Sequence, residues 1–465
     1  MDDTTCGCSR RQAIRSLLGG SLLLPAILSD LSSAGEPQAS ADPLAPRAPH
    51  FPAKAKRVIF LYMSGGVSHV DSFDYKPRLF ADAGKSVAGE GHKKKPRFLT
   101  RPRWDFKPRG KCGTEVSELF PHIAECMDDI CLIRSMRTDH GNHFEATLQI
   151  HTGSFTFARP SIGSWLSYGL GTFNQNLPSF VVLAPQLPYA GGQVWGSDFL
   201  PGCHQGVRVV PGSEPIPNIN RRLESEALQN TDLALLEFLN KQHMAQRQND
   251  PALAARIKSF ETAYGMQREA PDVFDLTKES DATLKLYGLE RGSSKGFAWQ
   301  CLVARRMAER GVRFIELIDV GASNNWDAHG DMDTHAPLAR NVDRPVAALL
   351  KDLKSRGMLD ETLVVWTTEF GRTPFCEKAD QKGREHHRLA FSSWLAGGGV
   401  KAGTAYGKTD EYGIDVAEKG VHVHDFHATI LHLLGLDHEK LTYRHAGRDF
   451  RLTDVHGNVV KDIVA

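Results

Sequence analysis

The sequence predicts an α/β protein, a three-layer sandwich in which helices cover both faces of a mostly parallel central sheet. Short continuous apolar runs, such as residues 57–63 and 179–183, have the length of strands that are buried on both faces. Longer stretches with helical spacing, such as residues 295–310 and 336–357, alternate with these runs. Acidic residues and histidines follow the runs in the last third of the chain, and ligand sites in open α/β sheets form at the carboxyl ends of strands.

Size and charge narrow the class of protein. The chain has 465 residues, of which 41% are hydrophobic and 24% charged, values typical of a globular protein with a large core. Its net charge of +1 gives no reason to expect a nucleic acid or a membrane surface as a partner. A basic stretch between His92 and Lys111 contains Trp104 and Phe106 and could bind a polyanion. Because charge runs usually face solvent, we interpret it as a surface loop.

The N-terminus has the pattern of an export signal. Arg10 and Arg11 form a twin-arginine pair, a moderately apolar segment follows at 17–28, and residues 39–41 read Ala-Ser-Ala. We interpret residues 1–41 as a twin-arginine signal peptide and expect the protein to be periplasmic or secreted, with the twin-arginine export machinery as a partner. No other stretch reaches the length of a transmembrane helix, so we predict no transmembrane segment.

The remaining chain is predicted to be one domain with surface insertions. Residues 42–56 are a linker, and the domain covers residues 57–465 with insertions near 85–112 and 186–290. Residues 186–225 are rich in Gly and Pro and predict an ordered surface excursion. The other predicted elements are a helix at 116–129, strands at 130–133 and 179–183, helices within 226–290, and a helix at 426–434 capped by Asp425.

Carboxylates and imidazoles at the predicted strand ends suggest a metal site. Asp71 follows the first strand, although an Asp there could equally cap a helix. Asp327 and His329 are two residues apart and could reach one ion from an irregular loop. Such ligands suit a divalent metal such as Zn²⁺, Mn²⁺ or Ca²⁺ in a water-filled site.

Two further clusters extend this set. Glu369 follows the apolar run at 363–366, and Arg372 is close enough in sequence to hold an oxyanion. His386 and His387 are adjacent, so they should point in different directions. We therefore expect one of them to bind the metal and the other to form a hydrogen bond.

His143 stands at the start of a predicted helix, residues 144–150. A helix N-terminus offers free N–H groups and the positive end of the dipole, which suits phosphate or sulfate. The alternative is ordinary capping of this helix by Asp139 or Asn142. The two histidines beside the cap, His140 and His143, favour a functional role.

Several motifs resemble one exported bacterial family, called domain of unknown function 1501. The motifs are Met63-Ser64-Gly65-Gly66, Asp71-Ser72-Phe73-Asp74, Arg159-Pro160-Ser161-Ile162-Gly163, Glu369-Phe370-Gly371-Arg372-Thr373-Pro374 and Gly447-Arg448-Asp449-Phe450. The family in turn resembles the alkaline phosphatase/sulfatase superfamily, which implies an alkaline phosphatase-like core. Members of that superfamily hold one or two metals at strand ends and cleave phosphate or sulfate esters.

The resemblance implies roles for individual residues. Asp71 is similar to the superfamily's first-strand metal acid, and Asp327 with His329 to its late ligand pair. Glu369 falls where an Asp-His pair is expected, and His386 or His387 where the last ligand His is expected. His143 falls at the position of the nucleophile, where sulfatases have Cys or Ser, so a formylglycine mechanism is not expected.

Two functions follow from these residues. The first is a metal-dependent hydrolase that acts on a sulfated or phosphorylated small molecule or polysaccharide, with a metal-activated water or His143 attacking and Arg372 steadying the developing charge. The second is a non-catalytic exported protein that binds metal and acts in surface or carbohydrate binding. The missing nucleophile favours the second, and the acid–histidine set favours the first.

Overall fold

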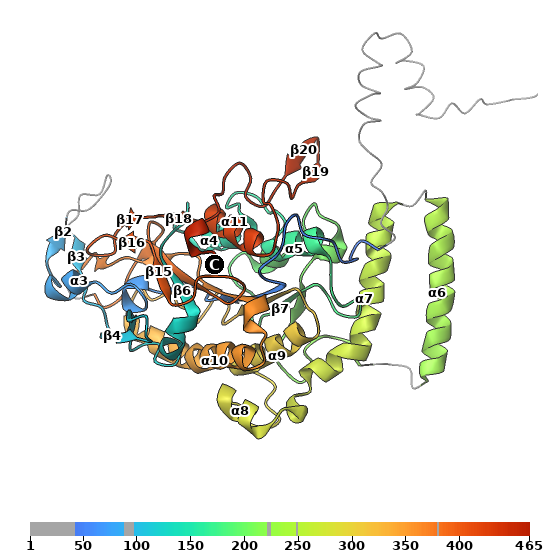
Figure 1. The fold of residues 1–465 in the computed structure, drawn as a ribbon, viewed down its shortest axis with the longest axis horizontal. Helices are drawn as coiled ribbons and strands as arrows, with labels where there is room; N and C mark the ends of the chain where they lie inside the picture. The colour runs from blue at the N-terminus through green and yellow to red at the C-terminus, as the bar shows by residue number, and fades with distance from the viewer. Residues whose placement is uncertain (1–41, 88–96, 221–224, 248–249, 379–380) are drawn as a thin grey trace, which may run out of the picture. The chain divides into compact units, whose positions relative to one another are not determined.

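A nine-stranded sheet forms the centre of the fold in the computed structural model (Figure 1). The structure describes residues 42–87, 97–220, 225–247, 250–378 and 381–465. The strands of the sheet, in spatial order, are β15 (Thr404–Tyr406), β6 (Ile130–Arg137), β14 (Phe391–Ala396), β10 (Thr362–Thr367), β1 (Arg57–Tyr62), β9 (Phe314–Ile318), β7 (Phe180–Leu183) and β8 (Val207–Val209), with β18 (Val421–His422) paired to β6.

Most strand pairs in this sheet are parallel, and the predicted fold class is confirmed. β1 lies between β10 and β9 and is parallel to both, with Leu61 opposite Trp366 on one side and Leu317 on the other. β7 is parallel to β9 and β8. Only β14 runs antiparallel to its neighbours β10 and β6. The carboxyl ends of β1, β9 and β10 therefore meet at one edge.

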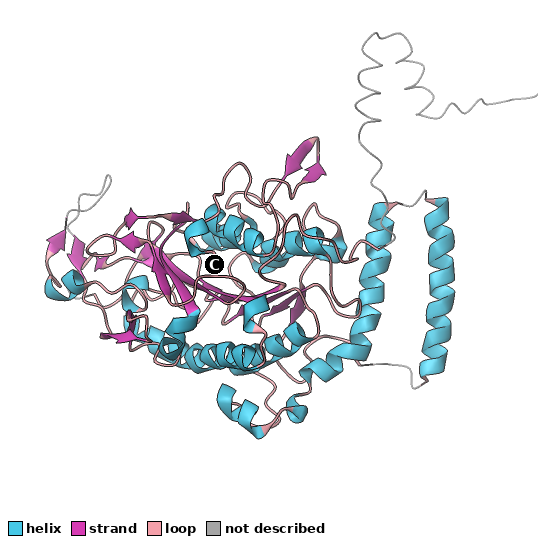
Figure 2. Cartoon of the chain, viewed as in Figure 1, coloured by secondary structure: helices cyan, strands magenta, loops and turns pink. Residues whose placement is uncertain are grey.

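Helices cover both faces of the sheet (Figure 2). Ile59 and Leu61 of β1 belong to the core cluster that includes α9 (Phe297–Glu309) and α10 (His335–Ser355). Val58 and Phe60 belong to the opposite cluster, which includes α4 (His143–Thr152), α5 (Ile162–Leu170) and α11 (Val423–Leu433). Because successive side chains of a strand point to opposite faces, a strand buried on both faces reads as a continuous apolar run.

Three local predictions need correction. The helix predicted at 116–129 is not formed. The structure has β5 (Thr114–Ser117) followed by the 3₁₀ helix η2 (Ile123–Asp129) in this region. The excursion at 186–225 contains β8, an edge strand of the central sheet. The cap of α11 is His422, and Asp425 sits three residues later, where its carboxylate accepts from the His422 amide in a capping box.

The insertion after β8 forms a two-helix arm and a short helix. These helices are α6 (Glu226–Gln246), α7 (Pro251–Phe274) and α8 (Asp281–Tyr287). α7 buries residues along its length, including Thr262, Met266 and Val273, whereas α6 buries none.

The remaining elements are short. They are η1 (His69–Asp71), α3 (Pro77–Ala81), β2 (Ser86–Val87), β3 (Arg97–Leu99), β4 (Phe106–Arg109), η3 (Gly191–Trp195), η4 (Gly202–His204), η5 (Leu276–Lys278), η6 (Met332–Thr334), η7 (Leu359–Glu361), β11 (Gly371–Arg372), β12 (Phe375–Cys376), β13 (His386–His387), β16 (Lys408–Thr409), β17 (Val416–Glu418), β19 (Tyr443–His445), β20 (Arg448–Phe450) and η8 (Lys461–Ile463).

Within the described residues, no helix has both the length and the apolar character to cross a membrane. The twin-arginine segment at 1–41 lies outside the described residues.

Candidate metal centre

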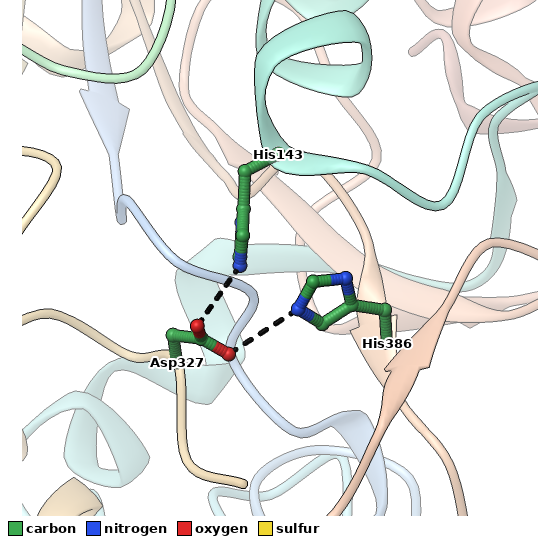
Figure 3. Close-up of side chains that lie close together, drawn as sticks. All are labelled: His143, Asp327 and His386. Atoms are coloured by element: carbon green, nitrogen blue, oxygen red, sulfur yellow. Dashed lines mark hydrogen bonds and ion pairs between the residues drawn. The ribbon is translucent and has the colours of Figure 1, made fainter.

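Three histidines surround the carboxylate of Asp327 beside the carboxyl ends of β1, β9 and β10. His143 begins α4, His386 lies in β13, and Asp327 and His329 lie in the loop between β9 and η6. His143 Nε2 lies 3.3 Å from Asp327 Oδ2, and His386 Nε2 lies 3.3 Å from Asp327 Oδ1 (Figure 3). His329 Nε2 lies 2.9 Å from the same Oδ1 atom. The ligand atoms of His143, Asp327 and His386 all lie within 4.8 Å of one another and could hold one metal ion, and His329 lies beside them.

The other ring nitrogen of each histidine fixes its tautomer. His143 Nδ1 lies 2.7 Å from Glu369 Oε1, and His329 Nδ1 lies 2.8 Å from Glu385 Oε2. His386 Nδ1 lies 2.8 Å from the backbone carbonyl of Gly141. A carbonyl or an ionised carboxylate only accepts, so Nδ1 carries the proton in all three rings. Each Nε2 faces the Asp327 carboxylate, where it either carries a second proton or, in a metal-bound centre, presents its lone pair to the ion.

This arrangement fits a metal ion. Metal-ligating histidines donate their other N–H to a carboxylate or a backbone carbonyl, which fixes the ring and raises its basicity. His329 Nε2 and His386 Nε2 lie 3.0 Å apart. Ligand atoms bonded to one tetrahedral zinc lie about 3.3 Å apart. His143 Nε2 is buried and faces Asp327 Oδ2 at 3.3 Å without the geometry of a hydrogen bond, so this atom is available to a ligand.

The pKa values of His143 and Asp327 show that the centre stabilises positive charge. Burial lowers the pKa of His143, but its bonds to Asp327 and Glu369 outweigh burial and raise the pKa overall. Burial raises the pKa of Asp327, yet the hydrogen bonds from His143 and His386 and the charge of Arg372 lower it strongly. The centre thus favours an additional positive charge, which a proton or a divalent metal can supply.

A double-glycine turn after β1 contacts Glu369 and Arg372, the residues that support the centre. Gly65 and Gly66 have φ of 115° and 84°, and a Cβ on Gly65 would lie 2.6 Å from the backbone nitrogen of Trp326. This backbone conformation suits glycine. The Gly65 amide donates to Glu369, while the carbonyls of Gly65 and Gly66 accept from Arg372.

The structure assigns Glu369 and Arg372 supporting positions. Glu369 is fully buried and accepts from His143 and, at 3.0 Å, from the hydroxyl of Tyr62, so it orients a ligand. Arg372 is fully buried and donates to Asp327 Oδ1 at 2.6 Å. The guanidinium of Arg372 donates to the carbonyls of Gly65, Gly66 and Arg384 as well as to Asp327, so the structure commits it to protein groups rather than to the substrate oxyanion that the sequence led us to expect.

Two predicted ligands lie outside the centre. Asp71 is fully buried and pairs with Arg384 at 2.7 Å, while its other oxygen accepts from the Arg103 amide. His387 donates from Nε2 to the carbonyl of Ile414 at 2.7 Å, and burial lowers its pKa to about 3. Of the adjacent pair at 386 and 387, it is His386 that the structure brings to the centre.

Sequence reasoning missed the outer partners. Glu385 adjoins His386, and this proximity could have signalled it, but the Gly141 carbonyl carries no side-chain signal. Tyr189 stacks on His143 at 4.3 Å between ring centroids, and Asn325 donates to the Tyr189 hydroxyl. The segment around Tyr189 is rich in Gly and Pro and has no helical or strand periodicity, so its sequence gives no sign that Tyr189 lies beside His143.

A cavity of about 590 Å³ adjoins the centre. Gly141, Glu385 and His386 form part of its wall, so it gives access to the His386 side of the centre. Two arginines, Arg97 and Arg388, and two glutamates, Glu377 and Glu385, line it, and Phe375 adds an apolar surface.

The fold and the site together define an α/β domain with a candidate metal centre at the strand ends. The chain belongs to the family described as "Protein of unknown function (DUF1501)", which matches residues 55–464. This confirms the resemblance drawn from the sequence motifs. A search of curated proteins gave no significant match.

Several solved structures are similar to this chain at low identity. The lipoteichoic acid synthase LtaP from Listeria monocytogenes is 9% identical with a TM-score of 0.36, covering 88% of this chain and 78% of that one. The alkaline phosphatase of the Antarctic bacterium TAB5 is 12% identical with a TM-score of 0.35, covering 83% and 99%. The PsFucS1 sulfatase from Pseudoalteromonas sp. is 11% identical with a TM-score of 0.34, covering 83% and 68%. These scores are low, so the site is assigned from its own residues.

Proposed function

We propose that this chain is an exported, metal-dependent hydrolase of sulfate or phosphate esters. One observation carries the proposal: His143, His329 and His386 all present Nε2 to the carboxylate of Asp327, and each has its Nδ1 proton held by an outer acceptor. Outer partners of this kind accompany metal ligands. Export through the twin-arginine route is part of the proposal and rests on Arg10 and Arg11.

The donor set limits the identity of the metal. The imidazoles of His143 and His386 and the carboxylate of Asp327, with His329 alongside, suit Zn²⁺ or Mn²⁺ better than Ca²⁺, which takes oxygen ligands. A divalent metal held by these four residues would supply Lewis-acid polarisation of an ester oxygen. Glu369 and Glu385 would hold two of the rings in place, and Arg372 would fix the Asp327 carboxylate.

The adjoining cavity supports an anionic ester as the substrate. Arg97 and Arg388 offer guanidinium groups in a space that reaches His386, beside Glu377 and Glu385, which balance their charge. Sulfate and phosphate groups are anions that guanidinium groups bind well. The organic part of the ester would lie against Phe375, Leu389 and Ile414, which line the same cavity.

One observation favours a second function, non-catalytic metal binding in surface or carbohydrate recognition. The residue that begins α4 is His143, and its side chain faces Asp327 rather than open space. No hydroxyl or thiol occupies this position, so a covalent intermediate on Ser, Thr or Cys is not expected there.

Hydrolysis of an ester panel separates the two functions. The mature chain, loaded in turn with Zn²⁺, Mn²⁺ and Ca²⁺, is assayed on aryl sulfates, phosphate monoesters, phosphate diesters and sulfated oligosaccharides. We expect turnover that a chelator removes and that His386→Ala lowers at least 100-fold. Bound metal without turnover on any ester would favour the non-catalytic function. Turnover that is unchanged in the chelated chain would contradict the metal-dependent proposal.

His143→Ala tests whether this residue is a ligand or a nucleophile. As a ligand, its loss should weaken metal binding. As a nucleophile, its loss should abolish turnover with metal affinity intact, and alkaline quenching of the wild-type reaction with a phosphate ester should trap a phosphohistidine, which is stable to base and labile to acid. We expect the first result, because Asp327 stands where an anionic ester would have to approach Nε2.

A further inference from the structure

Helix α6 is exposed along its whole length. None of its 21 residues is buried, although α7 beside it buries several. Polar bonds hold the two helices together: Gln229 donates to Gln267, and Tyr264 donates to Asn230. α7 therefore anchors the arm to the domain, and α6 forms its outer edge.

Large apolar side chains lie on this outer helix. Leu228 is 63% exposed, Leu235 59%, Phe238 56% and Leu239 50%. At 100° per residue, Leu228, Leu235 and Leu239 fall within about 40° of one line along the helix, with Phe238 on its flank. We call these four residues the α6 stripe. Leu233 and Leu236 instead line a groove of about 500 Å³ shared with Ile257 and Phe260 of α7.

Such a stripe calls for a partner. Isolated helices are marginally stable in water, and most helical stability in proteins comes from packing of an apolar face. Contiguous exposed apolar patches mark interaction surfaces. The α6 stripe is apolar at its centre and has charged residues towards both ends of the helix, as expected of a helix that packs against another helix.

We propose that the α6 stripe is a dimer interface, and that its partner is α6 of a second copy packed antiparallel. The charges of the helix support this partner. Glu226 and Asp232 lie in the amino-terminal half. Lys241, His243 and Arg247 lie in the carboxyl-terminal half or at its cap, together with Glu237, which pairs with Lys241 of the same helix. Antiparallel packing places the acidic half of each copy beside the basic half of the other.

A two-fold axis near the middle of α6 both packs the two α6 stripes together and places the acidic half of each helix beside the basic half of the other. It sets Leu235 of one copy opposite Leu239 of the other, and it brings Asp232 close to His243. Two-fold interfaces use the same patch on both subunits, so a self-complementary helix is sufficient. The arms of two copies would then form an intermolecular four-helix bundle, with α7 on each outer side.

Sedimentation equilibrium of the mature chain tests this proposal. We expect wild type to be a dimer at about 100 μM and to dissociate on dilution. The double variant Leu235→Glu with Leu239→Glu should weaken dimerisation at least about 100-fold. Glu has good helix propensity, so circular dichroism should show an unchanged helix content.

A matched control adds the same charge on another face. Phe157 is 67% and Val455 72% exposed, and neither belongs to α6. Phe157→Glu with Val455→Glu should therefore remain dimeric. A wild-type chain that stays monomeric at about 100 μM overturns the proposal. A monomeric chain that floats with phosphatidylethanolamine–phosphatidylglycerol vesicles overturns it in favour of a lipid surface. A folded double variant that dimerises as tightly as wild type overturns it as well.

Discussion

His329 and His386 bring their Nε2 atoms to within 3.0 Å of each other, beside the Oδ1 atom of Asp327. Each ring has its Nδ1 proton committed elsewhere, to Glu385 and to the Gly141 carbonyl. Two neutral rings in these tautomers would face each other with lone pairs, an unfavourable arrangement. A proton or a metal ion shared with Asp327 removes the conflict, and a divalent metal is the ligand we propose.

Glu369→Gln should weaken metal binding without removing a ligand. The amide can still accept from His143 Nδ1, but it lacks the charge that raises the basicity of the ring. Loss of such outer partners costs about 10–100-fold in metal affinity. Competition with a chromophoric chelator measures the Kd for Zn²⁺. Glu125→Gln, at an exposed ion pair with Lys351, is the control and should leave the Kd unchanged. An equal Kd in Glu369→Gln and wild type would contradict the orienting role.

Asp71→Asn should destabilise the fold and leave the metal content intact. The change leaves the buried Arg384 guanidinium without its counter-charge, which costs about 3–5 kcal/mol in free energy of unfolding. Urea unfolding measures this cost. Asp105→Asn, at an exposed ion pair with Arg101, is the control and should cost less than about 1 kcal/mol. If Asp71→Asn instead lost its metal at full stability, Asp71 would be a ligand after all.

The same pair predicts a pH dependence. Burial raises the pKa of Asp71, but the charge of Arg384 and the hydrogen bonds from Ser68 and Arg103 lower it by more, so the folded pKa lies below the unfolded value. The contribution to stability is therefore fully present above about pH 4 and is lost as the pH falls through the folded pKa. The difference in unfolding free energy between wild type and Asp71→Asn should not change between about pH 5 and pH 8. It should become smaller at lower pH. A difference that grows on acidification would contradict this account.

The sheet could be predicted from the sequence because its signal is local. β1, β7 and β10 are buried on both faces, so apolar runs mark them directly. The prediction of a helix at 116–129 was wrong. Val116 lies in a strand and Ile123 in a 3₁₀ helix, and both are buried, so the spacing of buried apolar residues did not distinguish these elements from one α-helix.

The centre could be predicted only in part. Asp327, His329 and His386 stand after strands or beside them, and residue type with position was enough to select them. Asp71 has the same local signature, yet its partner Arg384 lies 313 positions away in the sequence. Pairing of that kind is decided by the tertiary fold, and so is the role of the Gly141 carbonyl.

Export should depend on the arginine pair. Changing Arg10 and Arg11 together to Lys preserves charge but removes the twin-arginine motif, so the chain should accumulate in the cytoplasm. Fractionation followed by immunoblotting measures the distribution. Arg47→Lys, beyond the predicted signal, is the control. Equal periplasmic yield from the double variant and wild type would contradict twin-arginine export.

Metal should stabilise the fold. A ligand that binds only the native state at 100 times its Kd adds about 2.7 kcal/mol to the free energy of unfolding. Calorimetry of the chelated chain, with and without added Zn²⁺, should show a higher Tm with metal. The shift should be smaller in His386→Ala than in His445→Ala, whose histidine is exposed in β19. Equal shifts in the two variants would place the bound metal elsewhere.

Elemental analysis of the natively exported chain tests the metal centre most directly. We expect about one equivalent of a divalent metal in wild type and in His445→Ala, and a loss of most of it in His329→Ala and His386→Ala. Wild-type chain that contains no metal, and takes up none from Zn²⁺, Mn²⁺ or Ca²⁺, would contradict the account.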